Sequence, residues 1–503
     1  MGGIGAFGRM TAAVWALVRN DALLPRELDG LYPSSVAGLA KLLRIFAGAG
    51  ARHGRPGERL ARSLEGMGPV AIKLGQILST RGDFFGREFA EDLGRLRDQL
   101  SPFPTAVARV ELERTLGRSI ESLYAEFGDP IAAASLAQAH EAKLLDGRKV
   151  AVKVLRPGIE RRVADDAESL MLAARLIDRW IAPARRLEPK AFAATVVRAT
   201  MLELDLRLEA AGADELREVM ALDGYMVAPG IVWDGVGKRA LTMEWARGWP
   251  LSDPKALTQP GLNRQASADN LIRAFLSQAL DHGVFHADLH EGNLFLAAPS
   301  QLTAIDFGII GRIGPAERRY LAEILWGFLN KDYEGVARTH FNAGYVPAHH
   351  SVAAFAQALR AVGEPVFGRP ASEVPMSRVL MQLFEITALY DMHLRPELIL
   401  LQKTMTMVEG VARRIQPDHD IWTAADPVVR RWMARELSPA ARVKRFADET
   451  ATALRNLTRL IETAPVAETR DVKAIKGEGS ALIGFALGAV VAGAAFLLAR
   501  YLG

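Results

Sequence analysis

The order and spacing of a few polar residues constrain this chain of 503 residues more than any other feature. Lys153 ends the apolar segment Val150–Lys153, and a lysine on a strand can reach the phosphates of a nucleotide. Further along, Asp288 and Asn293 stand in the pattern His-x-Asp-x-x-x-x-Asn, and Asp306 opens an Asp-Phe-Gly segment. Carboxylate and amide oxygens are ligands that Mg²⁺ prefers. The arrangement predicts a nucleotide site with Asp288 as the base and with Asn293 and Asp306 as metal ligands.

A carboxylate to pair with Lys153 is predicted on the segment Glu203–Glu209. If this segment is one helix, Glu203 and Glu209 lie about 240° apart around its axis, because each residue turns an α-helix by about 100°. The two carboxylates then face different partners. One of them is predicted to pair with Lys153, and the other is left for a second partner.

An alanine-rich stretch precedes Lys153 at the place where a glycine-rich loop would otherwise approach a bound phosphate. Alanine lacks the backbone freedom of glycine, so we expect this loop to be held back from phosphate. Downstream, Gly308 leads directly into Ile309–Gly314, without the Ala-Pro-Glu segment that follows a peptide-docking loop. Both features argue against ordinary protein phosphorylation. The candidate nucleotide-binding residues are Lys153 together with Ile131, Ala132, Ala133, Ala134, Ser135, Leu136, Ala137, Gln138 and Ala139.

Over roughly residues 60–440 the chain resembles the UbiB-type atypical kinases. The departures from an ordinary kinase, such as the alanine-rich loop, are part of this resemblance. The segment Lys73–Gln76 reads Lys-Leu-Gly-Gln and matches the K-x-G-Q motif of that family. Gly212 departs from the family pattern, in which asparagine is expected. Further matches are the alanine-rich loop Ala132–Gln138, the E-x-D motif at Glu203 and Asp205, the helix segment Glu209–Ala211, and Asp288, Asn293 and Asp306.

The resemblance implies an α+β, protein-kinase-like fold of two lobes, with the K-x-G-Q helices packed over the active site. In such a fold Lys73 would meet Glu203, and Lys153 would meet Glu209. The implied catalytic residues are Asp288, Lys153 and Glu209, and the implied regulatory residues are Lys73, Gln76, Glu203 and Asp205.

The resemblance also implies an atypical kinase or ATPase that uses Mg²⁺ with ATP or ADP and supports ubiquinone biosynthesis. A membrane lipid or an isoprenoid phenol is the implied ligand, and other proteins of ubiquinone biosynthesis are the implied partners. Two alternatives stay open: a pseudokinase scaffold that binds nucleotide without chemistry, and a polyprenylphenol hydroxylase. Intact Asp288 and Asp306 argue against the scaffold. A hydroxylase needs flavin or a redox metal, and the Gly-x-Gly-x-x-Gly run at Gly3–Gly8 has no strand before it.

The composition of the chain excludes further kinds of site and function. The chain has no cysteine, which rules out disulfides and thiolate metal sites. A formal charge of +4 and the absence of dense basic runs argue against nucleic-acid binding. His282, His286 and His290 are spaced as on one helix face, but the residues between them predict a turn and a strand, so no metal site is expected there. The pair His349–His350 is predicted to be solvated in a loop.

The segment Ala481–Ala499 contains no charged residue and is long enough for a bilayer-spanning helix, which needs roughly 20 apolar residues. We therefore predict one transmembrane helix at residues 480–500. The prediction places the protein in the cell inner membrane by this single C-terminal span, with its kinase-like domain in the cytoplasm. Gly484 and Gly488 form a Gly-x-x-x-Gly pair, a pattern that lets two such helices approach and suggests a homodimer.

The predicted organisation follows these motifs. Residues 1–20 predict an amphipathic helix, 106–127 predict another helix, and 139–155 predict a β-hairpin. The predicted domains are an N-terminal helical segment (1–60), a K-x-G-Q helical extension (61–128), a kinase-like N-lobe with the alanine-rich loop (129–246), a helical C-lobe with the catalytic and metal motifs (247–461), a linker (462–479) and the transmembrane helix (480–500).

Overall fold

The computed structural model describes most of the chain from the N-terminus to residue 438. The described residues are 2–27, 34–48, 51, 53–79, 87–94, 96, 101–180, 185, 188–367, 386, 389–392, 395–436 and 438. The chain divides into two compact units, Met1–Arg430 and Arg431–Gly503. Every residue of the candidate site lies in the first unit.

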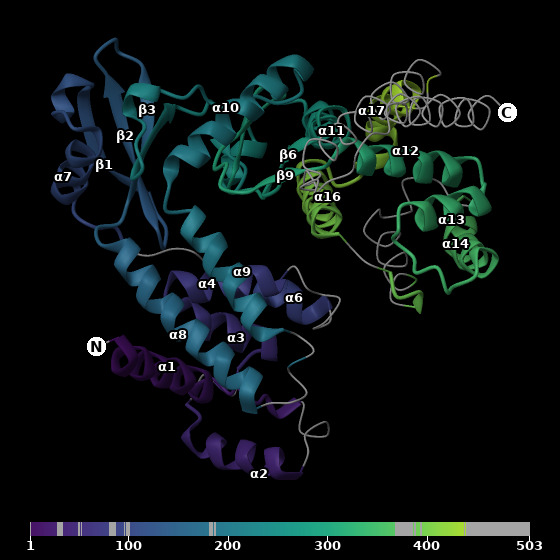
Figure 1. Cartoon of the computed structure of the whole chain (residues 1–503). Helices are drawn as coiled ribbons and strands as arrows, with labels where there is room; N and C mark the ends of the chain where they lie inside the picture. Colours follow the sequence, from purple (N-terminus) through teal and green to yellow (C-terminus); the bar gives the residue numbers. More distant parts are fainter. Residues whose placement is uncertain are drawn as a thin grey trace, which may run out of the picture. The chain divides into compact units, whose positions relative to one another are not determined.

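The N-terminal half of the described chain is mostly helical around one antiparallel sheet (Figure 1). In chain order the elements are α1 (Gly2–Arg19), α2 (Ser34–Leu43), α3 (Pro56–Glu65), α4 (Pro69–Ser79), α6 (Arg87–Leu93), α7 (Thr105–Leu116), β1 (Tyr124–Ala133), β2 (Ala137–Leu144), β3 (Lys149–Leu155), α8 (Ile159–Trp180), α9 (Pro189–Leu202), α10 (Leu206–Asp223) and β4 (Ala240–Glu244).

Helices dominate the rest, with short strands between them. The elements are β5 (Trp249–Pro250), α11 (Arg264–Leu276), β6 (Val284–His286), β7 (Leu294–Ala297), β8 (Gln301–Ala304), β9 (Ile310–Arg312), α12 (Pro315–Leu329), α13 (Tyr333–Asn342), α14 (Val352–Phe367), α16 (Pro396–Ile415) and α17 (Ile421–Glu436). Strands β5, β7 and β8 form one small sheet, and β6 pairs with β9 in an antiparallel ladder.

The main sheet has the order β1-β2-β3-β4, and each neighbouring pair is antiparallel. Val150, Val152 and Val154 of β3 are buried against a core that includes Leu112 of α7. Side chains alternate across a strand, so Lys153 points to the opposite face. This alternation places the lysine on the side of the sheet from which α10 approaches.

The predicted hairpin at residues 139–155 is confirmed by the pairing of β2 with β3. The helix predicted over 106–127 is wrong in its second half, because α7 ends at Leu116. Gly117 closes it in a left-handed conformation (φ 68°), and its N–H bonds to Glu113 O. Strand β1 then begins at Tyr124, and most of its side chains are at least partly exposed, which removes the alternation that marks a strand in the sequence.

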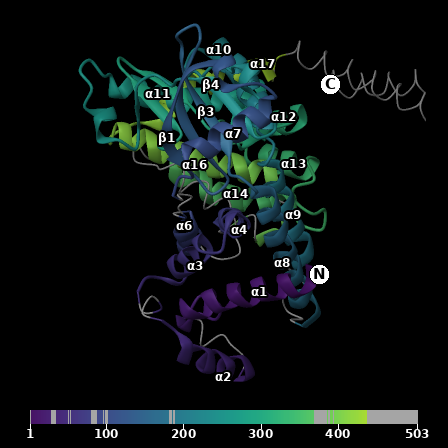
Figure 2. The same cartoon turned by 90° about the vertical axis from the view of Figure 1, so that its left-hand side faces the viewer.

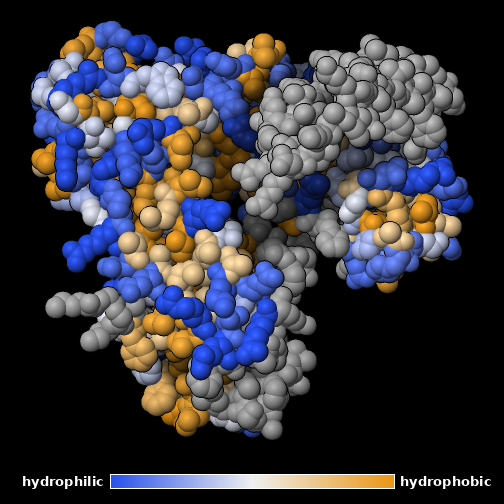
Figure 3. Space-filling view, viewed as in Figure 1, coloured by the Kyte–Doolittle hydropathy of each residue, from blue (hydrophilic) through white to orange (hydrophobic). Residues whose placement is uncertain are grey.

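Helices α1 and α4, which precede the sheet, pack on the helices α8 and α9 that follow β3. Helix α1 contacts α8, α4 contacts α9, and α3 packs on α6 (Figures 1 and 2). The helix predicted over residues 1–20 is present as α1. Figure 3 shows apolar side chains gathered over α1 and α2, and exposed apolar residues of this region include Phe7 and Trp15 of α1 and Ile45 and Phe46 of the 3-10 turn after α2.

The predicted transmembrane helix finds no support. In the part of the chain that the structure describes, no helix has both the length and the apolar character that a membrane crossing requires. The longest, α8, carries charged residues from Glu160 to Arg179, and charges are costly inside a bilayer. The predicted transmembrane helix of the fold class is therefore wrong, and so is the predicted single-pass membrane localisation. Residues 480–500, which carried them, lie outside the described residues.

Candidate active site

Three predicted site residues meet at one face of the main sheet. Lys153 Nζ lies 2.8 Å from Glu209 Oε1 and 2.9 Å from Glu209 Oε2, so the ammonium group binds both carboxylate oxygens. The same Nζ lies 3.4 Å from Asp306 Oδ1. Strand β3, helix α10 and the Asp-Phe-Gly segment each contribute one charged group. This arrangement gives a lysine held in place between two carboxylates.

The pKa values show how strongly these charges depend on one another. Burial alone would lower the pKa of Lys153, but the charges of Asp306 and Glu209 outweigh it and raise that pKa above its ordinary value. Burial raises the pKa of Glu209 to about 7, against the opposing effect of Lys153. The pKa of Asp306 is lowered, chiefly by the charge of Lys153. Lys153 and Asp306 are therefore charged near neutral pH.

The segment around Asp288 is fixed by a chain of hydrogen bonds. The backbone N–H of Asp288 donates to Nδ1 of His286 at 3.1 Å, and Nε2 of His286 lies 3.1 Å from Ile305 O. Nδ1 therefore accepts, and the ring proton lies on Nε2, where it donates to the carbonyl. Burial lowers the pKa of His286, which keeps the ring neutral. This neutral histidine orients the backbone that carries Asp288.

Asp306 lies directly opposite this loop, because strands β6 and β9 hold the two segments side by side. His286 pairs with Ile310 in the ladder, and the N–H of Ala287 donates to Ile309 O at 3.1 Å. Asp306 has a left-handed backbone (φ 58°), a conformation that aspartate tolerates better than most residues. Its side chain is 49% exposed, so a ligand in solution can reach the carboxylate.

Asn293 and Asp306 fit the requirements of a hard cation. Nδ2 of Asn293 donates to Asp288 O at 3.0 Å, which fixes the orientation of the amide and leaves Oδ1 as the ligand atom. The N–H of Ile305, the residue before Asp306, donates to Asn293 O at 2.9 Å and ties the two segments together. An amide oxygen and a carboxylate oxygen are ligands that Mg²⁺ accepts, with water and phosphate completing the shell.

The second lysine of the predicted site belongs to the N-terminal helices. Lys73 on α4 forms an ion pair with Glu203, which caps the C-terminus of α9. Both pairings implied by the resemblance are therefore present in the structure. Burial raises the pKa of Glu203, and the charge of Lys73 opposes this shift.

The single helix expected over 203–209 is wrong, because the chain breaks between α9 and α10. Asp205 caps α10: its carboxylate accepts from the N–H of Arg207 at 3.2 Å and also binds the Arg207 side chain. Glu203 thus ends one helix and Glu209 lies in the first turn of the next. The two carboxylates still face different lysines, but a helix boundary separates them rather than the turn of one helix.

The alanine-rich stretch forms the β1–β2 hairpin and its turn. Ala134 N–H donates to Ala137 O at 2.8 Å, and Nε of Arg156 donates to Ala134 O at 2.7 Å. Gln138 is buried, and its side chain bonds to both the N–H and the carbonyl of Phe103. Gln138 therefore anchors the hairpin to the preceding segment, and the nucleotide-binding role predicted for the stretch stays a prediction.

Helix α16 supplies residues that the sequence reasoning missed. Thr404 Oγ1 donates to Ala287 O at 3.2 Å, and Arg414 forms an ion pair with Glu291 in the loop that follows Asp288. Lys403 precedes Thr404 and is half-buried; this burial lowers its pKa, and the charge of Asp288 opposes the shift. No local motif marks Lys403, and only the packing of α16 brings it within reach of Asp288.

The remaining predicted residues and the histidines lie as follows. Gln76 is half-buried on α4. His282 ends a short π-helical turn, His286 lies in β6 and His290 lies in the loop after it, so they share no helix face. His290 Nε2 is 3.8 Å from Asp288 Oδ2. Catalytic and regulatory roles for the residues gathered around Lys153 remain predictions.

The architecture and this set of residues can be compared with known proteins. The model of the ABC1 atypical kinase-like domain matches residues 95–340, and that of the UbiB helical domain matches residues 359–420. A solved structure described as "The complex structure of Rv3197-erythromycin from Mycobacterium tuberculosis" is 22% identical, with a TM-score of 0.50. The match covers 78% of this chain and 98% of the solved chain, and the likeness supports the kinase-like fold.

Closer relatives carry the name "Probable protein kinase UbiB". The protein from Marinobacter nauticus is 40% identical over 393 residues, which cover 77% of this chain and 72% of the relative. The protein from Xylella fastidiosa is 37% identical, and the match covers 81% of this chain and 76% of the relative. The protein from Pseudomonas aeruginosa is also 37% identical, and the match covers 78% of this chain and 74% of the relative. The chain therefore belongs to the UbiB family of atypical kinase-like proteins.

Proposed function

We propose that this protein binds ATP or ADP with Mg²⁺ and hydrolyses ATP or transfers its γ-phosphate, in support of ubiquinone biosynthesis. The observation that carries the proposal is the meeting of Lys153, Glu209 and Asp306 within hydrogen-bonding distance. Lys153 is held where a cation would neutralise nucleotide phosphates. Asp306 and Asn293 would hold Mg²⁺, which when bound neutralises charge on the phosphates.

Asp288 is the proposed base in this reaction. Its carboxylate is 33% exposed, and His286 and Asn293 fix the backbone on either side of it. The oxygen of water, or of an acceptor hydroxyl, attacks the γ-phosphorus as Asp288 takes the proton. The bond from the γ-phosphorus to the bridging oxygen breaks, and ADP leaves with that electron pair.

The ligand that regulates turnover is proposed to be an isoprenoid phenol or a lipid, and proteins of the same pathway are proposed partners. A homodimer is proposed as well. The contacts between Lys73 and Glu203 support a link between the N-terminal helices and the nucleotide site. Such a link would let a ligand held by those helices change the position of α9 and α10.

Phosphate release from the purified protein tests the proposal. Asp288→Asn is expected to slow turnover by about 10²-fold and to leave the Kd for Mg²⁺–ADP nearly unchanged, because the base is lost and the metal ligands remain. Asp306→Asn is the matched variant, and it should weaken Mg²⁺-dependent nucleotide binding itself. Turnover would be measured with and without isoprenoid phenols.

The main alternative is a pseudokinase scaffold, and the same assay separates the two. A wild-type protein that binds Mg²⁺–ADP but releases phosphate no faster than Asp288→Asn would support the scaffold. Ordinary turnover by Asp288→Asn would instead mean that Asp288 only positions the loop.

A further inference from the structure

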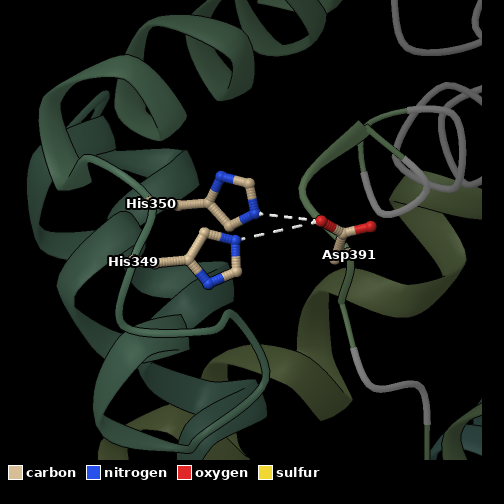
Figure 4. A group of neighbouring side chains, drawn as sticks. All are labelled: His349, His350 and Asp391. Carbon is tan, nitrogen blue, oxygen red and sulfur yellow. Dashed lines mark ion pairs between the residues drawn. The ribbon is translucent and has the colours of Figure 1, made fainter.

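A second group of metal-ligating side chains lies away from the nucleotide site. His349 and His350 follow one another in the loop between α13 and α14, and Asp391 lies in the short described segment before α16 (Figure 4). Nε2 of His350 is 3.4 Å from Asp391 Oδ2, and Nε2 of His349 is 4.0 Å from the same oxygen. Both imidazoles thus turn the same nitrogen toward one carboxylate oxygen.

We propose that His349, His350 and Asp391 form a binding site for a divalent transition-metal ion, with Zn²⁺ as the best fit. Two imidazole nitrogens and one carboxylate oxygen are a donor set that suits zinc, and water completes a tetrahedral shell. The nucleotide site differs in its chemistry, since Asn293 and Asp306 offer oxygen atoms alone. The proposed site is therefore selective for a different metal and independent of nucleotide.

The distances are close to those that coordination requires. Zinc binds imidazole nitrogen and carboxylate oxygen at about 2.0–2.1 Å, so neighbouring ligand atoms in a tetrahedron are about 3.4 Å apart. The three ligand atoms lie within 4.8 Å of one another, and the pair formed by His350 and Asp391 already has the tetrahedral spacing. The His349 ring packs on that of His350 at 4.1 Å between centroids and is otherwise 68% exposed, so the remaining adjustment is a small movement of this exposed ring along its neighbour.

One of the three ligands is held in place by the core. The ring of His350 packs on Tyr390 at 5.3 Å between centroids, and Tyr390 packs on Phe355 at 4.9 Å. Nε2 of His350 is shielded from solvent and has no hydrogen-bond partner among the described residues. A buried nitrogen that faces a carboxylate oxygen without a hydrogen bond is costly, and a metal ion between the two atoms would satisfy both.

The bound ion would join two segments that are distant in the sequence. The loop after α13 carries two ligands, and the residue after Tyr390 carries the third. Because the unfolded chain cannot hold these side chains together, metal binding would stabilise the folded state. The expectation of a solvated loop pair holds for His349, which is 68% exposed, but not for His350, whose Nε2 is shielded from solvent.

Zinc binding to the full chain, free of any histidine tag and stripped of metal, tests the site. A competition titration against a chromophoric zinc chelator, with excess Mg²⁺ present, should show about one equivalent bound. His349→Ala and Asp391→Asn are each expected to lower zinc affinity at least tenfold. Zinc should raise the melting temperature of the wild-type protein and have much less effect on either variant.

Two control variants make the result specific. His53→Ala removes an exposed histidine far along the chain, and His290→Ala removes the histidine beside Asp288; both should bind zinc like the wild type. Because His349 is exposed, His349→Ala should keep the metal-free melting temperature, which keeps the test readable if Asp391→Asn folds poorly. The proposal is overturned if the wild type binds no zinc, if His349→Ala binds it unchanged, or if His290→Ala alone loses it.

Discussion

Helices α4 and α10 carry the same two features and use them differently. Each presents one member of a lysine–glutamate pair, Lys73 on α4 and Glu209 on α10. Each also carries a glycine at a close contact. A Cβ on Gly75 would lie 2.2 Å from a methyl carbon of Leu96, and one on Gly212 would lie 2.3 Å from a methyl carbon of Ile310.

The difference lies in what each glycine lets its helix approach. Gly75 brings α4 against other N-terminal helices, because its next neighbour is Leu64 of α3. Gly212 brings α10 against the segment that follows Asp306. Helix α10 therefore borders the candidate nucleotide site directly, whereas the described contact of α4 with this region is the ion pair between Lys73 and Glu203. The comparison suggests that one pair serves nucleotide binding and the other connects the N-terminal helices to it.

The largest expected effect concerns the pH dependence of stability. The pKa of Glu209 is raised from an ordinary 4.5 to about 7, so its contribution to stability is fully present below pH 4.5 and is lost as pH rises through about 7. Glu209→Gln should remove this loss, which amounts to about 3 kcal/mol. Denaturant unfolding measured against pH would show a flatter profile for the variant. Parallel profiles for wild type and Glu209→Gln would contradict the assignment.

The next effect separates the two lysines directly. Lys153→Met should weaken Mg²⁺–ADP binding about 100-fold, because it removes the cation that faces the phosphates and leaves Glu209 buried without a partner. Lys73→Met should change the same Kd by less than about threefold, since Lys73 contacts Glu203 alone among these groups. Calorimetric titration with ADP measures both. Equal losses in the two variants would remove the distinction between α4 and α10.

A smaller effect is expected from the two glycines. Gly75→Val and Gly212→Val should each lower the free energy of unfolding by about 1–3 kcal/mol, because each inserts carbon atoms into a filled contact. Only Gly212→Val should also weaken nucleotide binding, since it pushes on Ile310 next to the segment of Asp306. Unfolding curves and ADP titrations on the same samples measure both effects. An equal loss of ADP affinity in Gly75→Val and Gly212→Val would contradict the prediction.

The smallest effect concerns Lys403, which senses the charges of both Asp288 and Lys73. Lys403→Met should lower kcat by about tenfold with little change in KM, because the lost cation lies beside the base rather than on the nucleotide. In the wild type, turnover should also fall as pH rises through the lowered pKa of Lys403. A pH–rate profile of Lys403→Met that keeps this fall would show that Lys403 has only a structural role.

The parts of the site that the sequence predicts are those with local patterns. The spacing of Asp288 and Asn293 and the Asp-Phe-Gly segment at Asp306 identify the candidate metal ligands, because short loops carry them. The hairpin that holds Lys153 is visible in its alternating residues and turn. These local signals, together with the resemblance, were enough to expect both lysine–glutamate pairs.

The parts that were not predicted depend on packing. Strand β1 has irregular register with β2, including bulges, so its apolar residues follow no simple period. The break before α10 depends on a side-chain cap at Asp205 rather than on proline or glycine. Lys403 comes near Asp288, and Asp391 comes near His350, because segments distant in the sequence pack together. No local sequence pattern indicates either contact.

The contact between Gly212 and Ile310 has a consequence for how this family can vary. A larger residue at 212 would collide with the methyl end of Ile310, so it would have to displace that side chain or be accompanied by a smaller residue at 310. The resemblance described above implies asparagine at the position of Gly212. Relatives that keep asparagine there are expected to carry a smaller side chain at the position of Ile310, and the two substitutions should appear together across lineages.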